Sequence, residues 1–100
     1  MSDTAETVIE RTRSALADVA GCLAFKSRQV EVKVIRAQKT VVFELFVPSS
    51  DMVQVLGRGS KTLGALREVV ERLGERAQLN FLLEVVERPP SGAASAALEW

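Results

Sequence analysis

The spacing of apolar and polar residues along the chain predicts helices and strands in a simple order. Apolar residues recur at helical spacing over residues 4–23, which predicts a first helix that Asp3 and Glu6 begin as a capping pair. Valines alternate with charged residues over 30–35 and predict a strand with one buried face. The run VVFELFV at 41–47 is almost wholly apolar and rich in β-branched residues, so it predicts a central strand. The core residues expected of the first helix are Val8, Ala15, Leu16, Val19 and Leu23.

The second half of the chain predicts two helices and a last strand. Pro48 ends the second strand, and a short helix follows, capped by Ser49 or Ser50, with Asp51 near its positive N-terminal end. Gly57 ends this short helix. From residue 61 the apolar positions follow i, i+3, i+7 and i+10, which predicts a third helix with one buried stripe. That stripe is Leu63, Leu66, Val70 and Leu73, and residues 78–87 predict the last strand.

This order of elements, helix-strand-strand-helix-helix-strand, predicts an α+β fold with a three-stranded mixed sheet. A hairpin pairs the first two strands, and the two-helix connection brings the last strand back parallel to the second. The three helices then cover one face of the sheet. We expect a single domain over residues 1–87 and a flexible C-terminal tail over 88–100, which is rich in Pro, Gly, Ala and Ser.

Composition and charge narrow the class of protein. The 100 residues are 47% hydrophobic and 26% charged, which is typical of one folded domain. Thirteen basic residues balance thirteen acidic ones, so no global field draws the chain to nucleic acid or to a membrane, and any charge argument is local. Residues 26–39 are such a local excess, because they hold five basic residues against Glu31 alone. This basic segment is either a solvated face or an extension of a binding path.

The sequence shows neither a secretion signal nor a membrane-spanning segment. No apolar run approaches the roughly twenty residues of a membrane helix, and the first residues do not resemble a signal peptide. The one cysteine, Cys22, cannot form an internal disulfide and lies among apolar residues, so we expect it in the core. These features predict a soluble, cytoplasmic protein.

Catalysis finds little support in the residue types present. The sequence has no histidine and no tyrosine, so it offers no nucleophile and base pair and no metal cluster. The string GRGSKT lacks the spacing of a Walker phosphate loop. We therefore expect neither an enzyme nor a cofactor.

The stretch VLGRGSKTLGALREVV, residues 55–70, interrupts the helical pattern with three glycines and three basic residues. One interpretation is a joint between helices, in which Gly57 takes a positive φ, Gly59 allows a tight turn and Ser60 caps the next helix. The other is an anion site, because a glycine loop at a helix N-terminus exposes N–H groups at the positive end of the helix dipole. Arg58 and Lys61 would add two cations there.

This stretch is similar to the V-I-G-x-x-G-x-x-I-x-x-[LI]-R segment of the KH domain, whose GxxG loop joins two helices and clamps single-stranded nucleic acid. The expected order of elements is also that of the type II KH fold. The resemblance covers residues 3–87, and the length resembles that of the small stand-alone bacterial RNA-binding proteins of the KhpA type. One position differs from the family pattern: the fourth residue of the loop is Ser60, where the family has glycine. The matching positions are Val55, Leu56, Gly57, Leu63, Leu66 and Arg67.

The resemblance implies a protein that clamps single-stranded RNA with low sequence specificity, as an RNA chaperone or post-transcriptional regulator. It implies phosphate contacts from the amides near Ser60 and Lys61, and a groove for bases whose floor includes the strand around Phe81 and Leu83. It also implies a homodimer, or a heterodimer with a larger KH protein of the KhpB or Jag type. The alternative is a KH-like interaction or dimerisation module with weakened or lost RNA binding. The residues expected to contact RNA are Gly57, Arg58, Gly59, Ser60, Lys61, Val53, Leu56, Leu63 and Arg67.

Overall fold

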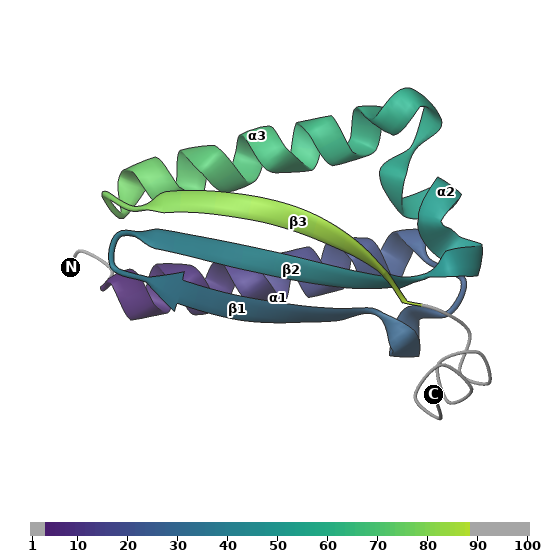
Figure 1. Cartoon of the computed structure of the whole chain (residues 1–100), viewed down its shortest axis with the longest axis horizontal. Helices are drawn as coiled ribbons and strands as arrows, with labels where there is room; N and C mark the ends of the chain where they lie inside the picture. Colours follow the sequence, from purple (N-terminus) through teal and green to yellow (C-terminus); the bar gives the residue numbers. More distant parts are fainter. Residues whose placement is uncertain (1–3, 89–100) are drawn as a thin grey trace, which may run out of the picture.

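The computed structural model describes residues 4–88 and confirms the predicted order of elements (Figure 1). The predicted C-terminal tail lies outside the described residues, apart from Arg88. Three single turns of 3-10 helix, at Ser27–Gln29, Ser49–Asp51 and Arg58–Ser60, join these elements. The helices and strands are α1 (Ala5–Leu23), β1 (Glu31–Ala37), β2 (Thr40–Pro48), α2 (Met52–Leu56), α3 (Lys61–Arg76) and β3 (Asn80–Arg88).

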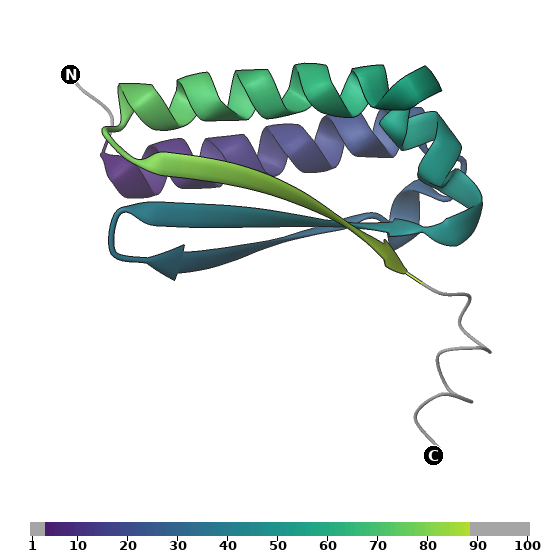
Figure 2. The ribbon, with the colours of Figure 1, turned by 45° about the horizontal axis from the view of Figure 1, so that its top comes forward.

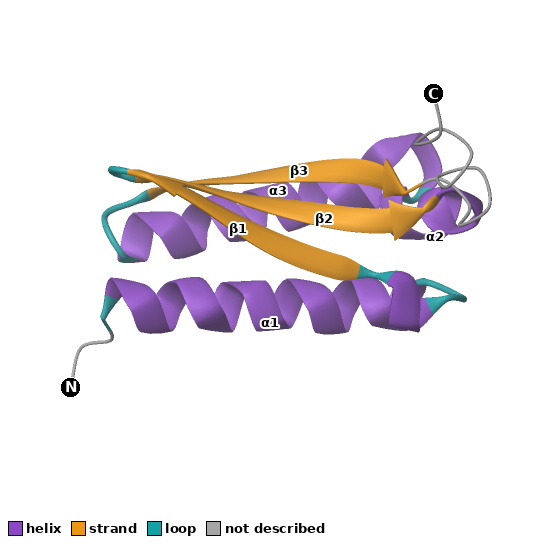
Figure 3. Ribbon diagram, turned by 60° about the horizontal axis from the view of Figure 1, so that its bottom comes forward, coloured by secondary structure: helices purple, strands orange, loops and turns teal. Residues whose placement is uncertain are grey.

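The three strands form one mixed sheet with β2 in the centre, as predicted. β1 pairs antiparallel with β2 in the register Glu31↔Phe46 to Ala37↔Thr40, which is the expected hairpin. β3 pairs parallel with β2, from Thr40↔Asn80 to Pro48↔Arg88. Helices α1 and α3 lie side by side across one face of the sheet, and α2 lies at one end of that layer (Figures 2 and 3).

The core lies between this helical layer and the sheet. Every second residue of β2 is buried, which is the pattern of a central strand covered on one face. The rings of Phe43 and Phe81 meet edge to face, with centroids 4.9 Å apart. Gly74 lets α3 approach β3 closely, because a Cβ on it would lie 2.8 Å from the Leu79 carbonyl oxygen. The α3 residues predicted for the buried stripe pack in this core or against it.

Helix α1 buries only part of the stripe predicted for it: Leu16 is buried and Val8 and Leu23 pack against the core, whereas Ala15 and Val19 are exposed. Its buried residues include Thr12, whose hydroxyl donates to the Val8 carbonyl at 2.8 Å. Because that hydroxyl has a hydrogen-bond partner inside the helix, Thr12 can be buried. A polar residue at this position makes the buried stripe hard to recognise from the sequence. Val19, expected in the core, is 42% exposed. The buried set is Ile9, Thr12, Leu16 and Ala20.

Two further expectations for α1 are wrong. Its N-cap is Thr4 rather than Asp3, since the Thr4 side chain accepts a hydrogen bond from the Thr7 N–H at 3.2 Å. Cys22 is an exposed free thiol rather than a core residue. The position of Cys22 follows from the buried stripe, because Ala20 faces the sheet and the residue two places later points elsewhere.

The segment before α2 also differs from the expectation of a capped helix. No side chain caps α2 or the turn before it, and the Ser49 hydroxyl instead donates to the Arg88 carbonyl at 3.1 Å. Asp51 is completely buried, and its carboxylate accepts hydrogen bonds from the N–H groups of Phe25 (3.0 Å) and Lys26 (2.8 Å). Asp51 therefore ties the connection between α1 and β1 to the start of α2.

Candidate functional site

Residues 57–61, the GRGSK loop, join α2 to α3 at one end of the molecule (Figure 1). Gly57 ends α2 as predicted, and its N–H donates to the Val53 carbonyl at 2.9 Å. Its backbone angles, φ 79° and ψ 168°, belong to a region that only glycine occupies readily. A Cβ on Gly57 would also lie 2.3 Å from Thr62 Oγ1 and 3.0 Å from Thr62 N. Both backbone and packing therefore require glycine here.

Gly59 and Ser60 share one left-handed conformation. Gly59 has φ 61° and ψ 25°, and Ser60 has φ 60° and ψ 26°. A helix-capping serine normally has an extended backbone, and Ser60 in fact makes no capping hydrogen bond, so the predicted cap is wrong. A Cβ on Gly59 would meet nothing within 4 Å. The surface beside Gly59 is thus open for a ligand to approach the main chain.

The amides of the GRGSK loop divide into two pairs. The Ser60 N–H donates to the Gly57 carbonyl at 3.0 Å, and the Lys61 N–H donates to the Arg58 carbonyl. The expectation that these two amides are available to phosphate is therefore wrong. The N–H groups of Arg58 and Gly59 precede the first hydrogen bond of the turn, so the turn itself supplies them with no acceptor.

The charge of the GRGSK loop is positive. Arg58 and Lys61 are exposed, and the ion pairs recorded within residues 4–88 involve neither of them. Helix α3 has no acidic residue in its first turn, so its own side chains do not neutralise the positive end of its dipole at the loop. Two cations, two amides and a helix N-terminus thus meet at one exposed bend.

The other residues expected to contact RNA lie in several environments. Val53 on α2 is 74% exposed, and Leu56 is half-buried beside the loop. Leu63 is buried and belongs to the core. Phe81 and Leu83, expected in the groove floor, are core residues too. The structure therefore brings Val53 and Leu56 near the loop, while Leu63, Phe81 and Leu83 face the interior.

Arg67 joins α3 to the free edge of the sheet. Its side chain is exposed, and its Nε donates to the Leu83 carbonyl at 3.2 Å. Within the described residues β3 is an edge strand of the sheet, since only β2 pairs with it. Arg67 consequently ties α3 to the main chain of this edge strand.

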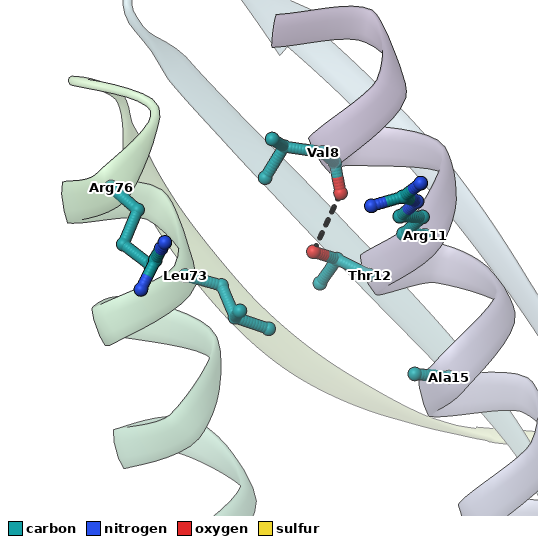
Figure 4. Close-up of a pocket in the computed structure, with 6 residues that line it drawn as sticks. All are labelled: Val8, Arg11, Thr12, Ala15, Leu73 and Arg76. Carbon is teal, nitrogen blue, oxygen red and sulfur yellow. Dashed lines mark hydrogen bonds between the residues drawn. The ribbon is translucent and has the colours of Figure 1, made fainter. Parts of the chain in front are cut away.

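A second surface feature lies between α1 and α3, and the sequence analysis did not predict it. A cavity of about 270 Å³ opens there, and Arg11 and Arg76 are among its lining residues (Figure 4). Beside it lies a smaller, mainly apolar depression of about 70 Å³. Val19 and Val69 line the depression and are 42% and 53% exposed. An apolar groove thus runs between the two long helices.

Residues 4–88 contain neither a membrane-spanning helix nor a metal-binding cluster. No helix in that range has the length and apolar character to cross a membrane. The same range contains no cluster of three acidic, cysteine or histidine side chains arranged to hold a metal ion.

Comparison with known proteins finds relatives of one kind. No family model matches the chain. A protein of Chlamydia trachomatis named RNA-binding protein KhpA is 26% identical over 72 residues, which are 72% of this chain and 92% of that protein. A protein of the same name from Aquifex aeolicus is 29% identical over 80 residues, 80% of this chain and 92% of its own. The similarity thus spans nearly the whole of those proteins rather than one module of a larger chain.

Proposed function

We propose that this chain binds single-stranded RNA through the GRGSK loop, with low sequence specificity, as an RNA chaperone or post-transcriptional regulator. The observation that carries the proposal is the exposed, cationic, glycine-containing bend at the N-terminus of α3. The similarity to proteins named for RNA binding supports it, because that similarity extends over most of the chain.

In this proposal, phosphate groups of the strand meet main-chain and side-chain donors together. The N–H groups of Arg58 and Gly59 donate to one phosphate, and the side chains of Arg58 and Lys61 supply charge to it and its neighbours. The open surface beside Gly59 lets the sugar-phosphate backbone come close. Exposed Val53 offers an apolar contact to a base. Backbone contacts of this kind carry little sequence information, which accounts for low specificity.

The test compares two double variants that each remove two positive charges from the exposed surface. Arg58→Gln with Lys61→Gln changes the loop, and Lys39→Gln with Arg72→Gln changes residues outside both the loop and the groove. Binding of a labelled single-stranded RNA is followed by fluorescence anisotropy at several salt concentrations. If the wild-type chain contacts about three phosphates, its log-log salt slope is roughly −2.

We expect the loop variant to bind at least about tenfold more weakly and to lower the magnitude of the salt slope by about 1.4, since two phosphate contacts are lost. The control variant should change neither quantity appreciably. Equal weakening by both variants would mean that RNA responds only to overall charge. Unchanged affinity in the loop variant would also refute the proposal and favour an interaction module.

The groove between α1 and α3 favours a second candidate function, a dimerisation module. We propose that a second copy of this chain, or a related KH protein of the KhpB or Jag type, covers this groove. The support is its apolar lining together with exposed Val19 and Val69. The two candidates are compatible, because the groove and the GRGSK loop are separate surfaces.

A further inference from the structure

Phe25 is the most exposed large apolar side chain of the described chain, at 80% exposure. The other three phenylalanines are covered: Phe43 and Phe81 lie in the core, and Phe46 lies beneath Lys33 and Arg88. A ring that projects into water loses the stabilisation that burial gives, and its surface is free to contact a ligand.

The backbone that carries this ring is firmly held. The buried carboxylate of Asp51 accepts the N–H groups of both Phe25 and Lys26, and hydrogen bonds to a charged acceptor are roughly twice as strong as neutral ones. The exposure of Phe25 is therefore built into the anchored connection between α1 and β1. An anchored ring of this kind binds a ligand with little loss of backbone freedom.

Two cations flank the ring. Phe25, Lys26, Arg28 and Gln29, here called the Phe25 patch, line an open depression of about 310 Å³. Lys26 and Arg28 are exposed, and the ion pairs recorded in the described part of the chain include neither. Lys26 and Arg28 carry two positive charges against the one carboxylate of Asp51, so the patch keeps a net positive charge. A flat apolar ring beside free cations suits a base and its phosphates.

The Phe25 patch lies at the same end of the molecule as the GRGSK loop (Figures 1 and 3). Asp51, which holds the patch, precedes α2, and Gly57 follows it. The five-residue helix α2 thus connects the two cationic groups along the chain. Exposed Val53 lies on the same short helix, between the two cationic groups.

Other basic residues of the segment 26–39 are engaged elsewhere. Lys33 lies over the Phe46 ring, 5.2 Å from its centroid, and Arg36 pairs with Glu6. Lys39 is in the turn between β1 and β2, at the end of the sheet opposite α2 (Figure 1). Only the start of the basic segment is therefore placed beside α2.

We propose that an RNA strand held by the GRGSK loop continues across α2 to the Phe25 patch, where one base stacks on Phe25 and adjacent phosphates contact Lys26 and Arg28. This inference rests on the proposed function and adds a second contact to it. An anionic membrane is the weaker choice of partner, because recognition of anionic lipids typically uses a cluster of about four to eight basic residues and the patch has two.

The experiment uses the full chain and two labelled RNAs of mixed sequence, about four and about twelve nucleotides long, which both fall within the range of site sizes of small single-strand modules. Phe25→Ala removes the ring, Phe25→Trp retains a stacking surface, and Ile35→Ala is the control at another exposed apolar residue. Circular dichroism melting verifies that each variant folds, which the exposure of Phe25 favours.

We expect Phe25→Ala to weaken binding of the longer RNA about fivefold or more, since stacking on one aromatic contributes about 1 kcal/mol or more per base. Binding of the short RNA should change less than about twofold, because the loop alone holds it. Phe25→Trp should retain the affinity for the longer RNA, and Ile35→Ala should behave as wild type.

The outcomes separate this inference from the proposed function. If Phe25→Ala binds both RNAs as wild type while the loop variant loses both, the patch contact is refuted and the loop proposal stands. If affinity for the longer RNA depends on Phe25 but not on Arg58 and Lys61, the stacking contact stands and the loop proposal fails. If the wild-type chain binds neither RNA, or if Phe25 instead governs binding to phosphatidylserine vesicles, the inference is refuted.

Discussion

Replacing Gly57 and Gly59 with alanine, one at a time, separates what the loop glycines do for the fold from what they do for a ligand. Both residues have positive φ, 79° and 61°, but their surroundings differ. A Cβ on Gly57 would collide with Thr62, whereas a Cβ on Gly59 would project into open space. We therefore expect Gly57→Ala to damage stability and Gly59→Ala to damage RNA binding.

The expected losses of stability follow from these geometries. At Gly59, alanine enters the left-handed region at about 1–2 kcal/mol and recovers about 0.4–1 kcal/mol from the smaller entropy of the unfolded chain. The net loss is about 1 kcal/mol, and Ser60 already tolerates nearly the same angles. At Gly57 the backbone strain of about 1–3 kcal/mol adds to overpacking of about 1–3 kcal/mol. The total of roughly 2–6 kcal/mol is a large share of the stability of a small domain.

Urea unfolding followed by far-ultraviolet circular dichroism measures the first effect, and RNA anisotropy measures the second. We expect Gly59→Ala to remain folded yet bind RNA roughly tenfold more weakly, because its methyl group displaces a phosphate from charge-assisted hydrogen bonds of about 1.5–3 kcal/mol. If Gly59→Ala bound RNA like the wild type, the main chain beside Gly59 would not be a contact. If it unfolded as readily as Gly57→Ala, the distinction between the two glycines would be wrong.

Three further substitutions test the GRGSK loop, α2 and the groove between α1 and α3. Ser60→Gly should stabilise the chain by about 0.5 kcal/mol, since relief of left-handed strain slightly exceeds the entropy cost of glycine. The same variant should bind RNA a few-fold more tightly. Weaker binding in the anisotropy titration would show instead that the Ser60 hydroxyl contacts RNA. Val69→Asp places a charge in the groove between α1 and α3, so this variant should be monomeric in sedimentation while short RNA still binds. Val53→Asp should instead weaken binding of short RNA and leave self-association unchanged. If the wild type is a dimer and Val69→Asp sediments like it, the groove is not the interface.

The topology was predictable because apolar periodicity and strand order agree in this chain. β2 reads as a central strand from its composition, and the connection through two helices predicts the parallel return of β3. The Gly57 stop and the span of α3 follow from equally local signals. These features depend on residues close together in the sequence, so the spacing of apolar residues and glycines predicts them directly.

The errors arose where a polar group is satisfied by a partner that local pattern does not reveal. Thr12 can face the core because its hydroxyl bonds to its own helix, and the buried stripe of α1 therefore includes Thr12 rather than Ala15 and Val19. Asp51 resembled a residue at the start of a helix, but its partners are the amides of residues 25 and 26. No periodicity reports a contact across that distance in sequence.

The candidate site was predictable in its residues but not in its hydrogen bonds. The string GRGSK identified the glycines and the cations of the site. It did not show that the amides of Ser60 and Lys61 donate hydrogen bonds within the turn, which leaves the amides of Arg58 and Gly59 for a ligand. Phe25 was missed, although a phenylalanine directly followed by Lys-Ser-Arg was a usable signal of an aromatic beside cations.

The short helix α2 links the two proposed contacts mechanically. A helix of five residues is not stable alone, because nucleation costs more than so few hydrogen bonds return. Burial of Val55 in the core and the anchoring of Asp51 at its start hold it in place. Since Asp51 anchors the Phe25 patch and α2 carries the GRGSK loop, the spacing between patch and loop is fixed before RNA arrives. A strand that engages one therefore meets the other without a further ordering cost, which favours binding through both.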